Sequence, residues 1–285
     1  MTKLHQEVGQ QAIEKKGWLR AYKWLILRRI SQLSILALFL MGPLLGLWIV
    51  KGNMASSLTL DILPLSDPYV MLQALMSGNL PTTEGLIGVV IVLAFYLLIG
   101  GRVYCSWVCP VNMVTDAAGW VRRKLGLKVS SQFSRSSRYW LLALTLILPP
   151  ITGAVVWELF NPVSLMFRGI IFGMGWAWMV IIAIFLFDLF ISQRGWCGHL
   201  CPVGAFYSLL GKKSLLRVSA TNREQCDDCN DCFVVCPEPK VITLALKGAD
   251  KGISPLIDES NCTNCGRCID VCDEEVFNFT NRFKS

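Results

Sequence analysis

Two runs of regularly spaced cysteines near the end of the chain constrain its fold more than any other feature. The first run reads Cys226-x-x-Cys229-x-x-Cys232-x-x-x-Cys236-Pro237, and the second reads Cys262-x-x-Cys265-x-x-Cys268-x-x-x-Cys272. Three thiolates at three-residue intervals can wrap one corner of a cubic iron–sulfur cluster, and with paired runs the fourth ligand comes from the other run. The spacing therefore predicts two 4Fe–4S clusters held in one small domain.

The interlocked pattern assigns four thiolates to each cluster. The first cluster takes Cys226, Cys229, Cys232 and Cys272. The second cluster takes Cys262, Cys265, Cys268 and Cys236. Zinc knuckles do not need paired runs of this spacing, and disulfides are rare in a reducing compartment. Asp273 stands where a proline usually follows the last cysteine, and this departure removes no ligand.

The segment that carries these runs, residues 217–285, is expected to form an α+β domain of the bacterial two-cluster ferredoxin kind. Residues 241–246 and 276–279 are rich in β-branched and aromatic side chains, which favour strands. Two short strands are therefore predicted there.

Long apolar segments dominate the rest of the chain. Hydrophobic residues make up 53% of the sequence and charged residues 16%, whereas soluble domains carry about 25% charged residues. A membrane span needs roughly 17–25 mostly apolar residues. Four spans are predicted, at residues 30–50, 85–101, 139–157 and 170–191. Pro149 and Pro150 are expected to kink the third. The expected fold is an all-α membrane bundle, residues 30–216, preceded by an amphipathic N-terminal segment, residues 1–29.

Lysine and arginine set the expected orientation of the bundle, because they accumulate on the cytoplasmic side. Residues 1–29 carry seven of them and residues 102–138 carry seven. Residues 51–84 carry only Lys51, and the loop after the third span carries only Arg168. Both termini and the cysteine runs are therefore expected in the cytoplasm of a multi-pass inner-membrane protein. This placement also accounts for the net charge of +7, so nucleic-acid binding is not expected.

The remaining four cysteines form a second repeat, with the pattern C-x-x-x-C-P. Residues 102–111 match residues 194–203 in their arginine, both cysteines, proline and valine. Each copy follows an even-numbered predicted span and precedes an amphipathic stretch. The bundle is therefore expected to consist of two parallel repeats related by an axis along the membrane normal.

The repeat raises the question of what its four thiols do. They are Cys105, Cys109, Cys197 and Cys201. One interpretation is a third thiolate centre, binding a metal or an iron–sulfur cluster. The second is a redox-active or metal-delivering set of thiols, and the third is simple helix packing, since free cysteine is often buried. His199 is not taken as a ligand, because Trp107 holds the matching position. With only His5 and His199, and no C-x-x-C-H motif, no haem is expected.

Taken together, these features resemble the NapH/MauN family of ferredoxin-type membrane proteins. The resemblance covers nearly the whole chain. It rests on both cysteine repeats, on residues 14–18 (Glu-Lys-Lys-Gly-Trp), on Trp157-Glu158 with residues 161–165, and on residues 236–239 (Cys-Pro-Glu-Pro).

The resemblance implies the membrane electron-transfer subunit of a quinol dehydrogenase. Such a subunit passes electrons from membrane quinol through a NapG-like iron–sulfur partner toward a periplasmic nitrate reductase, without carrying out nitrate chemistry itself. A quinol site needs a proton acceptor near the end of a span. The candidates are Asp61, Asp67, Glu158 and Asp188. The cytoplasmic orientation of the clusters contrasts with the periplasmic acceptor that the resemblance implies.

Two alternative functions stay open. Related membrane ferredoxins assist the assembly of copper enzymes, and paired thiols suit soft metals. The chain would then act in copper reduction or metalloenzyme assembly. In the other alternative it is a redox-sensing scaffold that anchors soluble partners through its tail.

Overall fold

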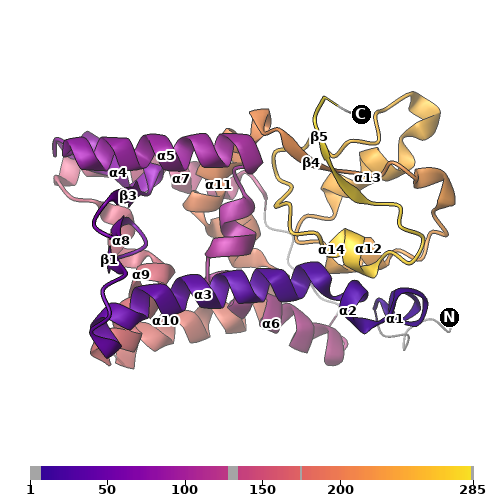
Figure 1. The fold of residues 1–285 in the computed structure, drawn as a ribbon, viewed down its shortest axis with the longest axis horizontal. Helices are drawn as coiled ribbons and strands as arrows, with labels where there is room; N and C mark the ends of the chain where they lie inside the picture. Colours follow the sequence, from indigo (N-terminus) through magenta and orange to yellow (C-terminus); the bar gives the residue numbers. More distant parts are fainter. Residues whose placement is uncertain (1–7, 128–133, 174, 284–285) are drawn as a thin grey trace. The chain divides into compact units, whose positions relative to one another are not determined.

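The computed structural model describes residues 8–127, 134–173 and 175–283 (Figure 1). The chain divides into two compact units. The tail unit combines Met1–Ser31, Tyr96–Trp107 and Ser208–Ser285, and the helical unit combines Gln32–Phe95 and Val108–Tyr207. This division differs from the three ranges expected from the sequence, because the N-terminal segment and two pieces of the middle region pack with the tail.

The tail unit is built on a two-stranded antiparallel sheet. Strand β4 (Leu216–Ser219) pairs with β5 (Asn278–Asn281), so that Leu216 lies opposite Asn281. Three short helices accompany the sheet: α12 (Asp231–Val235), α13 (Lys240–Lys247) and α14 (Arg267–Val271). The core contains Val218, Ile242 and Ile257, all buried, together with several of the cysteines. The N-terminal part contributes α1 (Gln10–Lys16) and α2 (Trp18–Ala21).

The prediction of a strand at residues 241–246 is wrong, because this segment forms α13. Val241, Ile242, Ala245 and Leu246 are its buried residues. Their spacing places them on one face of a helix, whereas alternate residues would face the core in a strand. The second predicted strand is displaced: β5 starts at Asn278, and Val276 and Phe277 are buried in the core before it.

The helical unit contains most of the long helices. They are α3 (Lys23–Leu45, which begins in the tail unit), α5 (Thr83–Ile99, which ends in the tail unit), α6 (Val111–Lys124), α7 (Ser137–Thr152), α9 (Pro162–Phe172), α10 (Gly175–Leu186) and α11 (Pro202–Leu210, which also ends in the tail unit). Shorter helices are α4 (Pro68–Met76) and α8 (Val156–Phe160). Helix α10 packs against α9 and α6, and α4 packs against α7 (Figure 1).

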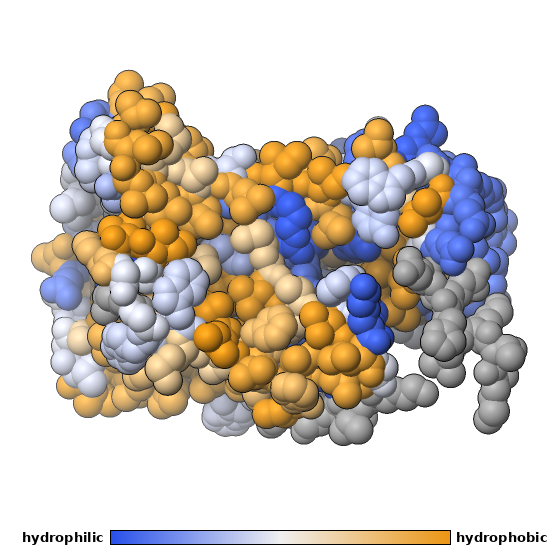
Figure 2. Space-filling view, turned by 90° about the horizontal axis from the view of Figure 1, so that it is seen from below, coloured by the Kyte–Doolittle hydropathy of each residue, from blue (hydrophilic) through white to orange (hydrophobic). Residues whose placement is uncertain are grey.

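In the described part of the chain, one helix is both long and apolar enough to cross a membrane, namely α3 with 23 residues. Three shorter apolar helices occupy Thr83–Ile99, Pro162–Phe172 and Gly175–Ile191. Large hydrophobic side chains such as Trp140 and Ile151 are exposed on the helical unit. Figure 2 shows extensive hydrophobic surface on one face of the molecule. Apolar surface of this extent marks contact with lipid or with other proteins.

The third and fourth predicted spans are interrupted by glycines. Helix α7 ends at Gly153, where φ is 66° and the amide donates to the carbonyl of Pro149. The chain therefore does not continue as one helix to residue 157. Helix α9 likewise ends at Gly173, with φ of 64°, so the predicted span at 170–191 crosses a helix boundary. Glycine adopts this left-handed conformation without a Cβ penalty and commonly ends helices.

The end of the first predicted span is also wrong, because α3 stops at Leu45 and Val50 begins a strand. An antiparallel meander of three short strands follows, which the sequence reading missed: β1 (Val50–Gly52), β2 (Ser56–Thr59) and β3 (Leu63–Ser66). Asn53 accepts hydrogen bonds from the amides of Ala55 and Ser56 and so forms the first turn.

The two C-x-x-x-C-P copies have the same local structure. Each starts with a single π-helical turn, η1 (Tyr104–Val108) in the first copy and η3 (Trp196–Leu200) in the second. An α-helix follows each turn, α6 after η1 and α11 after η3. Pro110 caps α6, and Pro202 opens α11, where its missing N–H costs no intrahelical hydrogen bond. Single π-turns are rare and cluster at functional sites.

Candidate functional site

One cavity of the tail unit is lined by four cysteines from both runs. They are Cys226, Cys229, Cys232 and Cys272. The first three come from the loop before α12 and from α12 itself, while Cys272 directly follows α14. The cavity, with its mouth, has a volume of about 320 Å³. Phe233, Leu246 and Phe277 supply apolar walls.

A second cavity is lined by the other four cysteines of the tail. They are Cys236, Cys262, Cys265 and Cys268. Its volume, again with its mouth, is about 350 Å³. Val218, Val241 and Ile257 form apolar walls. The eight tail cysteines thus divide into two sets of four, and each set contains one residue from the opposite run.

Residues in the left-handed backbone conformation let the chain wrap tightly around each cavity. Asp228 and Asn230 have φ of 57° and 65° in the first run, and Asn264 and Gly266 have φ of 47° and 71° in the second. Aspartate, asparagine and glycine tolerate this conformation better than other residues. The types of residue between the cysteines therefore allow the backbone conformation that each loop needs.

The thiols are poorly suited to carry charge without a metal. The pKa of Cys232 is raised to about 12, chiefly by burial and then by the neighbouring thiols of Cys229, Cys272 and Cys226. Burial likewise raises the pKa of Cys262 to about 11 and that of Cys268 well above its usual range. Four thiolates can share such a space only with a cationic partner, and bound metal deprotonates a coordinating thiol. The soft sulfur donors and apolar walls fit iron–sulfur clusters, which supply one-electron redox chemistry when bound.

The loop of the second cysteine run is held by residues of the first C-x-x-x-C-P copy. Ser106 donates to the carbonyl of Thr263 at 2.7 Å, and Trp107 donates to that of Asn264 at 3.1 Å. The Asn264 side chain donates in turn to two carbonyls, those of Ile99 and Leu216. These contacts lie within the tail unit and fix the position of the loop.

A buried ion pair supports the same loop. Arg102, the arginine of the first copy, lies 3.0 Å from Glu238, and both side chains are almost fully buried. Arg102 also donates to the carbonyl of Asn261. The sequence did not predict that Arg102 pairs with Glu238 and supports this loop. The one available signal was that the same arginine recurs in both C-x-x-x-C-P copies. Glu238 lies in the Cys-Pro-Glu-Pro segment on which the resemblance was based.

The N-terminal segment packs against the cysteine-bearing part of the tail. The amides of Trp24 and Leu25 both donate to the carboxylate of Asp270, at 3.0 Å each. Trp24 also packs edge-on against Phe279. Gly9 donates to Asp231 of the first run. These N-terminal residues therefore belong to the site. Nothing in the sequence of the N-terminal segment predicted their contacts with the tail.

The four cysteines of the C-x-x-x-C-P copies are half-buried. Cys105 belongs to the tail unit, and the other three belong to the helical unit. Cys197 lies near the hydroxyl of Thr115, with Sγ and Oγ1 3.9 Å apart. Arg194, the arginine of the second copy, forms an ion pair with Asp116 at 2.8 Å.

The four acidic candidates for a quinol site have different environments. Asp61 is exposed and paired with Lys51. Asp188 is fully buried and accepts a hydrogen bond from the amide of Trp196, which holds the second π-turn in place. Glu158 accepts from the side chains of Asn161 and Ser164.

The fourth candidate, Asp67, caps helix α4. Its carboxylate accepts from the amide of Tyr69 at 2.8 Å and from the hydroxyl of Tyr207 at 3.4 Å. Its pKa is raised to about 6, chiefly by burial and to a smaller extent by the charge of Glu158. Asp67 and Glu158 therefore interact electrostatically within the helical unit.

Comparison with known proteins finds two iron–sulfur families in the chain. The family described as "4Fe-4S dicluster domain" matches residues 225–276, and the family described as "4Fe-4S binding domain" matches twice, at residues 82–128 and 174–220. The chain is 47% identical to "Ferredoxin-type protein NapH" of Escherichia coli, over 100% of this chain and 99% of the relative. It is 52% identical to "Methylamine utilization ferredoxin-type protein MauN" of Methylorubrum extorquens, over 96% and 95% of the two chains. No solved structure matches the chain.

The fold of the tail and its paired cysteine cavities define an iron–sulfur electron-transfer protein of the ferredoxin type. The chain belongs to the NapH/MauN family of ferredoxin-type proteins.

Proposed function

We propose that the chain is the membrane electron-transfer subunit of a quinol dehydrogenase. It takes electrons from membrane quinol and passes them through a NapG-like iron–sulfur partner toward a periplasmic nitrate reductase. The observation that carries this proposal is the sorting of eight cysteines into two four-cysteine cavities. The apolar helices of the same chain supply the contact with lipid and quinol.

Each cavity binds one 4Fe–4S cluster in this proposal, with the ligand sets given above. When bound, each cluster accepts and releases one electron. Residues in the left-handed backbone conformation position the thiolates. Apolar side chains in the walls exclude water. Ser106, Trp107 and Arg102 hold the loop of the second set in place.

The helical unit is proposed to cross the inner membrane several times, with both termini in the cytoplasm. Lysine and arginine counts support this orientation. An epitope inserted after Leu80, an exposed residue between α4 and α5, is expected to be accessible in spheroplasts. The same epitope after Gly126, beyond α6, is expected to become accessible only after lysis. The reverse pattern would overturn the orientation.

Asp67 is the proposed proton acceptor for quinol oxidation, with Glu158 acting on it electrostatically. A carboxylate with a pKa of about 6 can accept a proton near neutral pH. The hydroxyl of Tyr207 orients it. Asp61, exposed and paired with Lys51, is a natural control because its pairing with a lysine does not suit proton uptake.

The test uses the full chain in lipid nanodiscs with a reduced quinol analogue. Reduction of the tail clusters is followed by EPR. We expect wild type and Asp61→Asn to be reduced at similar rates, and Asp67→Asn to be at least tenfold slower. Clusters that dithionite reduces but quinol does not would overturn the quinol role and leave electron transfer intact. Equal rates in all three proteins would exclude Asp67 as the proton acceptor.

We also propose that the four thiols of the C-x-x-x-C-P copies bind a third metal or iron–sulfur centre. The spacing of the two copies and the double match to a family described as "4Fe-4S binding domain" support it. Anaerobic iron and sulfide analysis of wild type and of a variant lacking Cys105, Cys109, Cys197 and Cys201 tests the idea. About eight irons in both proteins, the content of two four-iron clusters, would exclude a third iron centre.

A further inference from the structure

Each of the two cysteine cavities of the tail has two half-buried and two buried cysteines. In the first, Cys226 and Cys229 are half-buried while Cys232 and Cys272 are buried. In the second, Cys236 and Cys262 are half-buried while Cys265 and Cys268 are buried. Cluster potentials depend on burial, on hydrogen bonds to sulfur and on nearby charge. The loop around the first set is exposed at Asp227, Asp228 and Asn230, whereas Thr263 and Asn264 of the second loop are buried. The two cavities also differ in the charge of their surroundings.

Carboxylates surround the first cavity. Ligating atoms of Asp227, Cys229 and Asp273 all lie within 4.8 Å of one another. Asp227 and Asp228 line the cavity itself. Further carboxylates follow closely in the sequence: Asp231, Glu274 and Glu275. Among the described residues, the ion pairs of Lys15 with Glu274, Lys16 with Glu275 and Lys247 with Asp228 compensate part of this negative charge.

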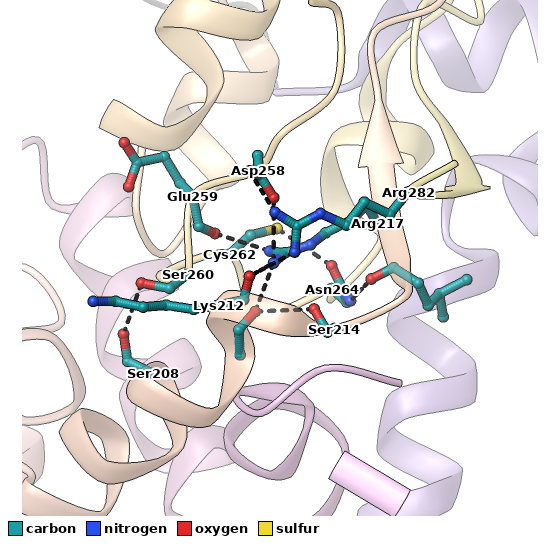
Figure 3. A network of polar contacts seen from close by, with 12 residues as sticks. Ser208, Lys212, Ser214, Arg217, Asp258, Glu259, Ser260, Cys262, Asn264 and Arg282 are labelled. Carbon is teal, nitrogen blue, oxygen red and sulfur yellow. Dashed lines mark hydrogen bonds and ion pairs between the residues drawn. The ribbon is translucent and has the colours of Figure 1, made fainter. Parts of the chain in front are cut away.

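An arginine lies near Cys262, one of the cysteines that line the second cavity (Figure 3). The guanidinium of Arg217 on β4 is 2% exposed and acts electrostatically on Cys262, where its charge opposes the effect of burial on the thiol. Its hydrogen bonds go to the carbonyls of Gly211, Lys212 and Glu259, which are neutral acceptors (Figure 3). Within the described residues, its Nε has no hydrogen-bond partner.

The positive charge of Arg217 is incompletely neutralised. Its nearest carboxylate, Asp258, is 3.5 Å away and about half exposed. Asp258 lies closer to Arg282, at 3.0 Å, so the two arginines share it (Figure 3). Arg102 is balanced by Glu238. The surroundings of Cys262 therefore retain a net positive charge, whereas those of Cys229 retain a net negative charge.

Reduction of a cluster adds one negative charge to it. A nearby cation stabilises the reduced form and raises the reduction potential, and a nearby carboxylate lowers it. We propose that Arg217, on one side, and Asp227 with Asp273, on the other, separate the reduction potentials of the two clusters, so that an electron in the tail resides on the cluster of Cys262. This inference rests on the proposed cluster binding. In the transfer between the two, the Cys229 cluster is oxidised by one electron and the Cys262 cluster is reduced by one.

The test is an EPR-monitored redox titration of the full chain in detergent, with dithionite as reductant. In Arg217→Gln, the ratio of reduced to oxidised cluster is expected to fall about tenfold for one EPR signal at a fixed solution potential. This corresponds to a reduction potential lowered by about 59 mV for one electron. In Asp227→Asn/Asp273→Asn, the other signal is expected to shift in the opposite direction. Lys251→Gln removes an exposed charge elsewhere in the tail and should shift neither.

Several outcomes would overturn the proposal. One is that Arg217→Gln leaves both potentials unchanged or shifts both equally, and another is that the two variants shift the same signal. If Arg217→Gln fails to retain its clusters, Arg217→Lys keeps the charge and must titrate like wild type, and the aspartate variant must still raise one potential alone. Because dithionite replaces quinol, loss of quinol oxidation does not affect the result. Absence of clusters in wild type would instead refute the proposed function.

Discussion

The indole Nε1 of Trp107 donates a hydrogen bond of 3.1 Å to the backbone carbonyl of Asn264. Trp107 lies between the two cysteines of the first C-x-x-x-C-P copy, and Asn264 lies between Cys262 and Cys265 of the second tail run. The contact joins two cysteine motifs that are far apart in the sequence. Asn264 has φ of 47°, so the loop is held at one of its least favourable backbone positions.

Trp107→Phe keeps the ring and removes the donor. We expect the loop to lose about 1 kcal/mol of local stability, the usual net contribution of one hydrogen bond. Iron release from the second cluster to a chelator should then be several times faster. Trp140→Phe changes an exposed tryptophan of α7 and is expected to leave the rate unchanged. Equal rates in both variants would contradict the role given to Trp107.

Gly266→Ala tests the close packing beside the same cluster. A Cβ at Gly266 would lie 2.5 Å from Cγ of Trp24, at a position where φ is already +71°. The conformation alone costs about 1–2 kcal/mol, and the overlap adds to it. Gly252→Ala is the matched control, because φ there is +65° but nothing lies within 4 Å. We expect only the first variant to lose the iron of the second cluster, as measured by iron content. Similar losses in both would show that backbone strain alone matters.

The buried pair of Arg102 and Glu238 can be tested with a double-mutant cycle. Arg102→Met leaves a buried carboxylate without this cation and should destabilise the tail by about 3–5 kcal/mol. Arg102→Met combined with Glu238→Met should recover most of this loss. Thermal unfolding followed by cluster absorbance measures both effects. Additive losses in the double variant would show that the two residues act independently.

Asp67 predicts a pH dependence of stability. Its pKa is raised from 3.8 to about 6 in the folded chain, so the folded state holds the proton more tightly than the unfolded state. The resulting stabilisation is full below about pH 3.8 and is lost as the pH rises through about 6.

Asp67→Asn removes this loss, because the amide stays neutral and still caps α4. We expect the variant to gain about 1–3 kcal/mol over wild type between pH 4 and pH 8. Thermal unfolding in detergent at the two pH values measures the difference. A constant difference between the two proteins across this range would refute the raised pKa.

The sequence predicted the features that depend on spacing. The cysteine intervals predicted two sets of four thiols, and the matching copies at residues 102–111 and 194–203 predicted an amphipathic stretch after each copy, where α6 and α11 lie. The π-turns within the two copies were not predicted. Such patterns depend only on residue spacing along the chain, so they can be recognised without knowledge of the tertiary structure.

The features that depend on tertiary packing were not predictable. Residues 241–246 favour a strand by composition, yet their buried face has helical spacing. Gly153 and Gly173 end helices inside segments that look uniformly apolar. Arg217 lies near Cys262 in the fold although the two are far apart in the sequence, and nothing around Arg217 in the sequence indicates a role (Figure 3).

The contacts of the N-terminal segment bear on the order in which the protein is made. Gly9 binds Asp231, Lys15 binds Glu274, and Lys16 donates to the carbonyl of Cys272. Residues 9–16 therefore reach these partners only after residues 231–274 have been synthesised. The helices of the middle region are synthesised in between, before the tail unit can close. A chain that stops before Cys262 would lack three of the four cysteines of the second set and Cys272 of the first.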